Sequence, residues 1–329
     1  MGEKVKVSIV LSFFNEEDVL EELVDRLRNV FRDVLKSNIS DYELIFVNDA
    51  STDRSKGILM NLSKGNEDIK IINMSRNFGV SPCVLAGMEF SSGDAVIYMD
   101  ADLQDPPELI PEMVKTWLQE EADVVHTKRL SRAGESKFKL WLTKIGYLIL
   151  NKVSNINIEP EVGDFKLLSR RAVNELVRLK EKKPFMRGMV NWIGFKQTTI
   201  LYNREARFAG ETKFKVYGWK VISNFLDSAL ISFSDVPLKF SLLVGFLVSI
   251  GAFCYLVIVF AMKYMGLSLP GWSAIMATML MIGGIQLFTT GMLGLYINVM
   301  FLEAKRRPNY IVESTFGFNG QSERQEADI

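Results

Sequence analysis

The fold is decided by residues 95–107, which read AVIYMDADLQDPP. The apolar run Ala95–Met99 predicts a short strand, Asp100 and Asp102 follow it at once, and Pro106-Pro107 then forces the chain in a new direction. At a strand end of this kind, two carboxylates can converge on one hard cation such as Mg²⁺ or Mn²⁺. The other interpretation is a solvated acidic turn, and this motif alone does not decide between them.

Three earlier apolar runs also predict strands, and helix-like segments alternate with them. The predicted strands are Val5–Leu11, Glu43–Val47 and Ile69–Ile72, and the helix-like segments are Val19–Lys36 and Ser55–Lys64. This alternation favours a parallel sheet covered on both faces, with ligands bound at the carboxyl ends of the strands. Three of the four strands end in polar residues, at Asn15-Glu16, Asn48-Asp49 and Asp100-Ala101-Asp102. We therefore expect an α/β catalytic domain over residues 1–235.

The C-terminal third predicts a membrane hairpin. Phe240–Met262 contains 23 uncharged residues, which as a helix measure about 35 Å and are long enough to cross a bilayer. A second apolar run follows a turn rich in glycine and proline, so we predict spans at 238–263 and 272–302 and a tail at 303–329. Basic residues flank the pair of spans, whereas the loop between them carries only Lys263. The positive-inside rule places both termini in the cytoplasm.

Two other segments, at about 136–153 and 214–233, have the composition of interfacial helices. Both combine aromatic and aliphatic residues at helical spacing with lysines, as in helices that lie in the headgroup layer. Ordinary helices that face a protein core are the alternative. The formal net charge is zero, so the composition indicates no nucleic-acid partner. The two cysteines, Cys83 and Cys254, are far apart and predict neither a disulfide framework nor a metal site.

Polar motifs follow each predicted strand in a fixed order, at residues 12–17, 47–53, 76–79 and 98–107. Together they resemble the family 2 glycosyltransferases of the GT-A fold, a Rossmann-like and mostly parallel sheet. The resemblance is to the branch that glycosylates polyprenyl phosphates, which includes GtrB-type glucosyltransferases and dolichyl-phosphate mannose synthase. It extends from residue 5 to about residue 310 and includes the membrane hairpin.

The resemblance implies roles for individual residues. Donor-nucleotide contacts are expected from Phe14, Asn15, Glu16, Asp49, Asn77, Arg207 and Lys213. Metal and diphosphate contacts are expected from Asp100, Asp102 and Gln104. The chain departs from many relatives at Ser12 and Phe14, where they have proline and tyrosine, and at Asn48, where aspartate is commoner. Stacking on the base survives these changes, but a contact from a tyrosine hydroxyl does not.

Asp164 and Asp102 are the expected catalytic residues. Asp164 follows a glycine, which has no side chain and so lets the backbone approach a crowded site closely. A helix N-cap is the alternative for this position. The acceptor phosphate is expected to meet cations between the metal motif and the membrane. The candidates are Lys128, Arg129, Lys137 and Lys139. His126, the only histidine, ends a predicted strand and is interpreted as structural rather than as a catalytic base.

The sequence thus predicts inverting transfer of a hexose, with glucose from UDP-glucose favoured, to polyprenyl (undecaprenyl) phosphate in the bacterial inner membrane. GDP-mannose and a 4-amino-arabinose donor are the nearest alternatives. Polysaccharide synthases usually carry a Q-x-x-R-W motif, and dinucleotide-dependent oxidoreductases carry G-x-G-x-x-G after the first strand, and both motifs are absent from this sequence. A non-catalytic membrane scaffold is a further alternative. Related proteins suggest a homo-oligomer, specifically a tetramer.

Overall fold

A computed structural model of the chain describes residues 4–34, 39–129, 162–203, 236–266 and 271–318. The chain divides into two compact units. The first is an α/β unit that includes the N-terminal region and the residues from Pro308 onward, and the second contains the two long C-terminal helices. The two predicted interfacial helices lie outside the described residues.

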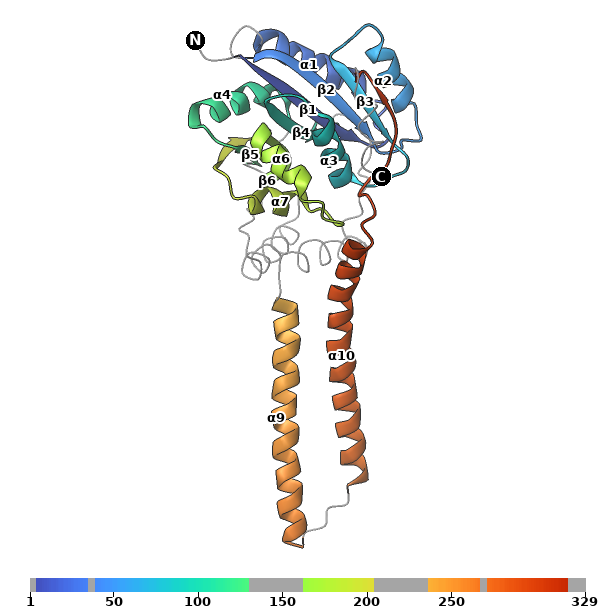
Figure 1. The fold of residues 1–329 in the computed structure, drawn as a ribbon, viewed down its shortest axis with the longest axis vertical. Helices are drawn as coiled ribbons and strands as arrows, with labels where there is room; N and C mark the ends of the chain where they lie inside the picture. Colours follow the sequence, from blue (N-terminus) through green and yellow to red (C-terminus); the bar gives the residue numbers. More distant parts are fainter. Residues whose placement is uncertain (1–3, 35–38, 130–161, 204–235, 267–270, 319–329) are drawn as a thin grey trace. The chain divides into compact units, whose positions relative to one another are not determined.

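An eight-stranded sheet forms the centre of the α/β unit. Its strands are β1 (Val5–Phe13), β2 (Ile39–Asn48), β3 (Ile69–Met74), β4 (Ala95–Asp100), β5 (Val124–Arg129), β6 (Val162–Ser169), β7 (Gln197–Tyr202) and β8 (Val312–Phe316). They lie in the order β7-β5-β6-β4-β1-β2-β3-β8 (Figure 1). The pairs β1–β2, β1–β4, β2–β3 and β5–β7 are parallel, whereas β6 runs antiparallel to β4 and β5. The predicted α/β fold with a mostly parallel sheet is therefore confirmed.

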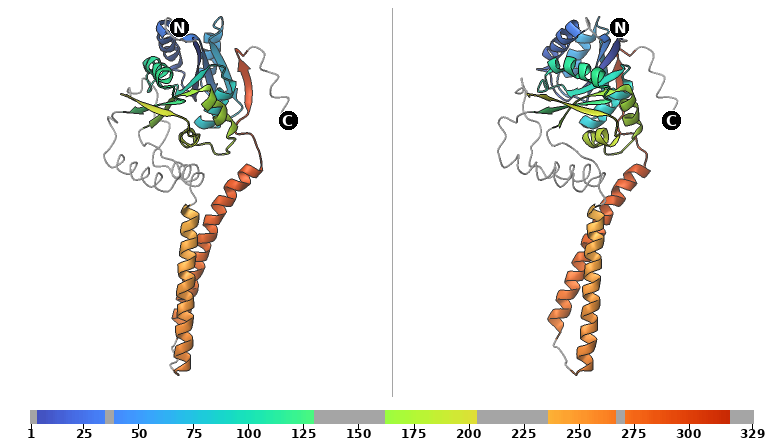
Figure 2. Two further views of the ribbon diagram at one scale, coloured as in Figure 1. Left: turned by 60° about the vertical axis from the view of Figure 1, so that its left-hand side comes forward. Right: turned by 90° about the vertical axis from the view of Figure 1, so that its left-hand side faces the viewer.

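Helices cover both faces of the sheet. On one face α1 (Leu20–Val34), α2 (Ser55–Ser63) and α4 (Ile110–Glu120), which follows the short helix η1 (Pro107–Leu109), close over the main apolar core. On the other face α3 (Val80–Phe90) packs on β1 and β2 and contacts α6 (Arg170–Arg178) (Figures 1 and 2). At Gly87 of α3 an added Cβ would lie 2.3 Å from Cγ1 of Val10. A side chain at this position would push α3 away from the sheet.

The strand β8 was not expected from the sequence. The chain after the long helices was predicted to be a tail, but within it β8 pairs antiparallel with β3 at the edge of the sheet. The backbone N–H of Ser75 also donates to the carbonyl of Ile311 at 3.0 Å. From Pro308 onward, the described part of the predicted tail is therefore a component of the α/β unit, whereas Glu303 and Ala304 end α10.

The second unit contains α9 (Val236–Tyr264) and α10 (Trp272–Ala304). Their apolar segments Leu238–Met262 and Met281–Ala304 have mean hydropathies of 2.7 and 1.5, and both are long enough to cross a bilayer. Large apolar side chains on them are exposed, such as Leu242 at 75% and Leu287 at 76%. Exposed apolar surface on this scale indicates association with a membrane.

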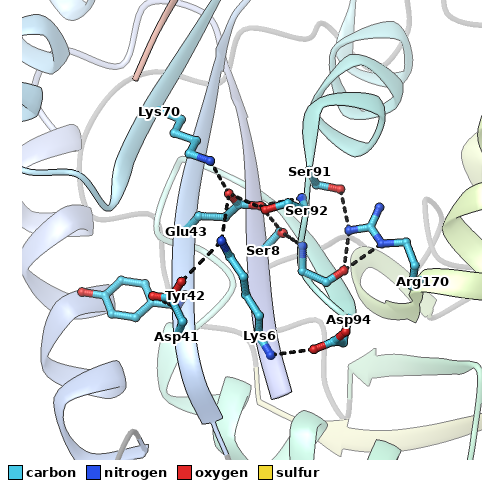
Figure 3. A network of polar contacts seen from close by, with 11 residues as sticks. Lys6, Ser8, Asp41, Tyr42, Glu43, Lys70, Ser91, Ser92, Asp94 and Arg170 are labelled. Atoms are coloured by element: carbon cyan, nitrogen blue, oxygen red, sulfur yellow. Dashed lines mark hydrogen bonds and ion pairs between the residues drawn. The ribbon is translucent and has the colours of Figure 1, made fainter. Parts of the chain in front are cut away.

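A buried carboxylate, Glu43, holds together the edge of the sheet where β1, β3 and β4 begin (Figure 3). It accepts hydrogen bonds from Ser8 Oγ at 2.5 Å, Lys70 Nζ at 2.5 Å and the backbone N–H of Ser92 at 2.7 Å. Burial raises the pKa of the Glu43 carboxyl, but these three partners outweigh burial and lower the pKa from 4.5 to about 2. No sequence pattern predicts this role, because Glu43 stands at the start of an ordinary apolar run.

Replacing Glu43 by glutamine should destabilise the α/β unit by about 3 kcal/mol, because Lys70 loses the charge that it faces. The melting temperature in detergent should fall by roughly 6–12 °C. Since the pKa is depressed in the folded state, the stabilisation is complete above pH 4.5 and is lost as the pH falls towards 2. The difference in melting temperature between the two proteins should therefore shrink over that range.

Asp41→Asn, which changes a neighbouring acid whose side chain is 63% exposed, is the control and should melt like the wild type. A Glu43→Gln protein as stable as the wild type at pH 7 would contradict this role.

Candidate active site

The polar motifs after β1, β2 and β4 meet at one edge of the sheet. The strand register pairs Phe13 with Asn48 and Ser12 with Asp100, so the three strands end side by side. Backbone hydrogen bonds join the segments that follow, from Asp49 N to Phe13 O at 3.0 Å and from Ala101 N to Ser12 O at 3.3 Å. The predicted convergence of these three motifs is therefore present in the structure.

Each of the three loops contains one residue other than glycine in the left-handed region of backbone conformation. These residues are Asn15 (φ 55°), Ala50 (φ 59°) and Leu103 (φ 56°). This conformation costs of order 1 kcal/mol per residue, and it persists only where the surroundings enforce it. Such strain tends to cluster at functional sites, and its recurrence in all three loops marks this edge as a candidate site.

The first two loops are tied to each other by side chains. The Asn15 backbone N–H donates to Ser51 Oγ at 3.0 Å, and Asn15 Oδ1 accepts from the Thr52 N–H at 2.7 Å. The Glu16 backbone N–H donates to Ser55 Oγ at 3.0 Å. Phe14, Asn15 and Glu16, all predicted to bind the donor nucleotide, thus stand on a loop whose position depends on the loop after β2.

Asp49 is buried and directed at the backbone of a third loop. Its carboxylate accepts the N–H of Phe78 at 2.6 Å and the N–H of Gly79 at 2.9 Å. It therefore holds the segment that carries Asn77, whose side chain is exposed. The structure shows that Asp49 organises the predicted nucleotide loops. Its predicted contact with the base or ribose stays a prediction.

Asp100 ends β4, and Asp102 is buried two residues later. Asp102 Oδ1 accepts the backbone N–H of Gln104 at 3.2 Å, which fixes the turn of the motif. Among the residues that the structure describes, no three acidic, histidine or cysteine side chains are grouped as a metal cage. Two carboxylates suit Mg²⁺ or Mn²⁺ when substrate phosphates and water supply the other ligands, so the residues present fit a metal bound together with the donor.

Asp164 lies within β6, which excludes the helix N-cap; Ser169 caps α6 instead, its Oγ accepting the N–H of Ala172 at 3.2 Å. Tyr98 of β4 pairs with Lys166 of β6. Burial raises the pKa of the Tyr98 hydroxyl, and the charges of Asp164 and Asp100 raise it further, so both acids lie near this tyrosine. The pairing of β4 with β6 thus places the expected catalytic acid near the acidic motif.

Arg187 of α7 (Met186–Trp192) forms a two-pronged ion pair with Asp164. The distances are 3.0 Å from Nε to Oδ1 and 2.6 Å from Nη2 to Oδ2. Burial raises the pKa of the Asp164 carboxyl, but Arg187 outweighs burial and the pKa is lowered. Asp164 is therefore held as a carboxylate, which suits an orienting or charge-balancing role better than proton abstraction.

A buried polar row continues from this pair along the sheet. Lys166 Nζ lies 3.1 Å from His126 Nδ1, and His126 Nε2 lies 2.7 Å from Gln197 Oε1. Burial lowers the pKa of Lys166 to about 7. The hydroxyl of Tyr98 is buried and finds no hydrogen-bond partner among the described residues. Both ring nitrogens of His126 are engaged inside the sheet, in agreement with its structural interpretation.

Two members of the predicted acceptor-phosphate set, Lys128 and Arg129, lie in β5. Arg129 is directed at the acidic motif, because its Nε donates to the hydroxyl of Tyr202 at 3.1 Å and its Nη2 lies 3.7 Å from Asp105 Oδ1. Tyr202 in turn donates to Asp105 at 2.5 Å. Lys128 is half-buried in the same strand. Lys137, Lys139, Arg207 and Lys213 lie outside the described residues.

Comparison with known proteins decides the family. The model of the family described as glycosyl transferase family 2 matches residues 8–177, which hold all three converging loops, Asp164 and Lys166. The chain belongs to glycosyltransferase family 2. The GT-A fold expected from the sequence agrees with this assignment.

Several relatives of this glycosyltransferase match it over almost its whole length. The Bacillus subtilis protein named uncharacterized glycosyltransferase YkcC is 42% identical, over 98% of this chain and 97% of that protein. The prophage bactoprenol glucosyl transferase homolog of Escherichia coli (strain K12) is 36% identical, over 94% and 99%. The bactoprenol glucosyl transferase of Shigella phage SfV is 35% identical, over 94% and 99%. Among solved structures, Staphylococcus aureus TarS 1–349 in complex with UDP-GlcNAc is similar with a TM-score of 0.46 and 17% identity, over 72% and 75%.

Three residues of this glycosyltransferase site were missed by the sequence analysis. Arg187 stands on a short helix well after the matched motifs. Tyr98 was included in the motif at 98–107 without a role, and Lys166 was assigned none. The alternation of Asp164 and Lys166 with the buried Phe165 and Leu167 is a signal from which a strand with a polar face could have been predicted.

Proposed function

We propose that this family 2 glycosyltransferase transfers glucose from UDP-glucose to a polyprenyl phosphate, with inversion at the anomeric carbon. The observation that carries the proposal is the similarity to bactoprenol glucosyl transferases over 94% of this chain, which includes both the converging loops and the two apolar helices. A protein that shared only the sugar-donor chemistry would not be expected to match through residues 236–304 as well.

The chemistry follows from the charges at the site. A phosphomonoester has a second pKa of about 6, so the acceptor already carries a nucleophilic oxygen at neutral pH. The reaction therefore needs no strong base, in agreement with an Asp164 that Arg187 keeps ionised. What the protein must do is bring two anions together in line, and orientation by fixed groups lowers the barrier to that encounter.

The residues present support a division of roles. The loops after β1 and β2, with Phe14, Glu16 and Asp49, bind and orient the nucleotide. Asp100 and Asp102, with Gln104 beside them, hold Mg²⁺ or Mn²⁺, which when bound neutralises charge on the diphosphate leaving group. Asp164 orients the acceptor beside this motif. Lys128 and Arg129, together with Lys137 and Lys139, offset the charge of the acceptor phosphate, and Arg207 and Lys213 that of the donor diphosphate.

The order of the strands along the chain supports a membrane protein whose α/β unit lies on one side of the bilayer. Strands before and after the apolar helices, β7 and β8, belong to one sheet, so the chain must cross the bilayer an even number of times between them. Two crossings by α9 and α10 meet this condition. With the basic residues that flank the hairpin, this supports placement in the bacterial inner membrane with the catalytic unit and both termini in the cytoplasm.

The test is to incubate the purified full-length protein with undecaprenyl phosphate and one labelled nucleotide-sugar at a time, and to resolve the lipid products. UDP-glucose should give a labelled glycolipid at least about tenfold faster than GDP-mannose or a UDP-4-amino-arabinose donor, since discrimination by well-placed polar contacts is worth 1.4 kcal/mol or more. A faster reaction with either competing donor would replace the proposed substrate. Failure to form any glycolipid with all three donors would remove the proposed reaction.

A further inference from the structure

The segment after the long helices reaches the candidate site through a row of side chains. Asn48, Asn73 and Ser314 occupy matching register positions on β2, β3 and β8. Asn48 Nδ2 donates to Asn73 Oδ1 at 2.9 Å, and Asn73 Nδ2 donates to Ser314 Oγ at 3.1 Å. At the other end, Asn48 Oδ1 accepts the backbone N–H of Ser51 at 2.9 Å, and Ser51 Oγ accepts the backbone N–H of Asn15. One continuous row thus joins β8 to the first two loops of the site.

The direction of this row is fixed by its chemistry. A backbone N–H can only donate, so Asn48 must present its oxygen to Ser51 and its amide nitrogen to Asn73. Asn73 must then present its oxygen to Asn48, which leaves its nitrogen for Ser314. Asn48 and Asn73 are 2% and 1% exposed, so water does not readily replace a lost partner. Loss of the Ser314 hydroxyl leaves the buried Asn73 Nδ2 without an acceptor. Because an unsatisfied buried donor is costly, the side chains of the row should then rearrange.

The loops at the far end of the row need such support. Asn15 and Ala50 both have left-handed backbones, and strained loops keep their shape only when several contacts enforce it. Ser51 directly follows Ala50 and is held at two points, through its backbone N–H by Asn48 and through its Oγ by Asn15. A shift of Ser51 would therefore move both loops together.

Residues 309–313 hold β8 in place against other parts of the α/β unit. The Tyr310 hydroxyl donates to Glu89 of α3, and Asn309 Nδ2 donates to the carbonyl of Glu181 at 2.7 Å. Lys56 of α2 forms an ion pair with Glu313 at 3.4 Å. The segment is thus anchored on two helices and on the loop at Glu181, besides β3, which allows Ser314 to act as a fixed end for the row.

We propose that the segment Asn309–Phe316 supports the donor-nucleotide site, and that Ser314 is a positioning residue for the loop that carries Phe14 and Glu16. Its ligand class is a nucleoside diphosphate or its sugar ester. The inference rests on the proposed function, since that function assigns the nucleotide to these loops. Ser314 touches no reacting atom and acts through Asn73, Asn48 and Ser51.

The experiment measures UDP binding by calorimetry with the full-length protein in detergent and Mg²⁺, in the absence of lipid acceptor. Ser314→Ala should raise the Kd for UDP and the KM for UDP-glucose by about five- to tenfold, as expected when one buried hydrogen bond of a positioning row is lost. The kcat at saturating donor should stay within about twofold, because binding and not the reacting groups is affected. Ser314→Thr keeps the hydroxyl and should bind UDP like the wild type.

Thr315→Ala is the matched control, because Thr315 neighbours Ser314 on β8 and projects from the opposite face of the strand. It should leave UDP binding unchanged. Wild-type affinity in Ser314→Ala, or equal losses in Ser314→Ala and Thr315→Ala, would overturn the inference. These outcomes leave the proposed function standing, whereas a wild-type protein that forms glycolipid from GDP-mannose and does not bind UDP removes the proposed donor itself.

Discussion

Asp102→Asn and Asp100→Asn are each expected to lower the rate of glycolipid formation by about 10³-fold, since each removes one of two carboxylates that fit a metal at the diphosphate. The loss should fall on kcat as well as on donor binding, because charge on the leaving group grows during transfer. The measurement is the initial rate of labelled glycolipid formation in the presence of Mg²⁺ or Mn²⁺.

Glu108→Gln is a suitable control for these variants. Glu108 follows the same motif, but its side chain is exposed and pairs with Arg26 on α1. Such surface pairs contribute little, so this variant should retain wild-type activity and stability. If either aspartate variant keeps more than about a tenth of wild-type activity, that carboxylate is not part of a required metal site.

Asp164→Asn is expected to reduce kcat by about 10²-fold while UDP binding stays unchanged, because a misplaced acceptor is costly even when the donor is bound well. Arg187→Gln should have a similar effect, since the two side chains form one ion pair with distances of 3.0 Å and 2.6 Å. If they act as a unit, the double variant should lose no more than the worse single variant.

The pH profile distinguishes orientation from base catalysis in this pair. Because Arg187 lowers the pKa of Asp164, the carboxylate remains ionised as the pH falls from 7 towards its ordinary range near 4. Activity between pH 6 and 8 should therefore not follow the protonation of Asp164.

The control for the Asp164 and Arg187 variants is Arg178→Gln, which changes an exposed ion pair with Glu175 in α6. Nearly full turnover by Asp164→Asn would remove Asp164 from the chemistry.

The converging loops were predictable because their information is local. Each apolar run ends directly in polar residues, and parallel strands place their carboxyl ends at one edge. Asp100 and Asp102 could therefore be placed near Asp49 without a structure. Asp164 was expected near this motif by resemblance, because the antiparallel pairing of β6 with β4 depends on a register that no single-chain pattern reveals.

Longer-range partners could not be predicted for a different reason. Arg187, Glu43 and Tyr202 acquire their roles only from residues distant in sequence, such as the pairing of Tyr202 with Asp105. The strand β8 was missed because it is short, contains Glu313, Ser314 and Thr315, and follows a basic stretch. Edge strands of this kind carry little hydrophobic pattern, so their composition resembles that of a solvated tail.

The central claim is that two neighbouring acids hold a divalent cation beside the site where an anionic lipid accepts the sugar. Its most direct test is formation of labelled glycolipid from UDP-glucose and undecaprenyl phosphate by the full-length protein before and after chelation. A chelator should abolish the product, and added Mg²⁺ or Mn²⁺ should restore it in the wild type, while a protein with alanine at both Asp100 and Asp102 should stay inactive. Undiminished transfer of sugar to lipid after chelation, or by the double alanine variant, would contradict it.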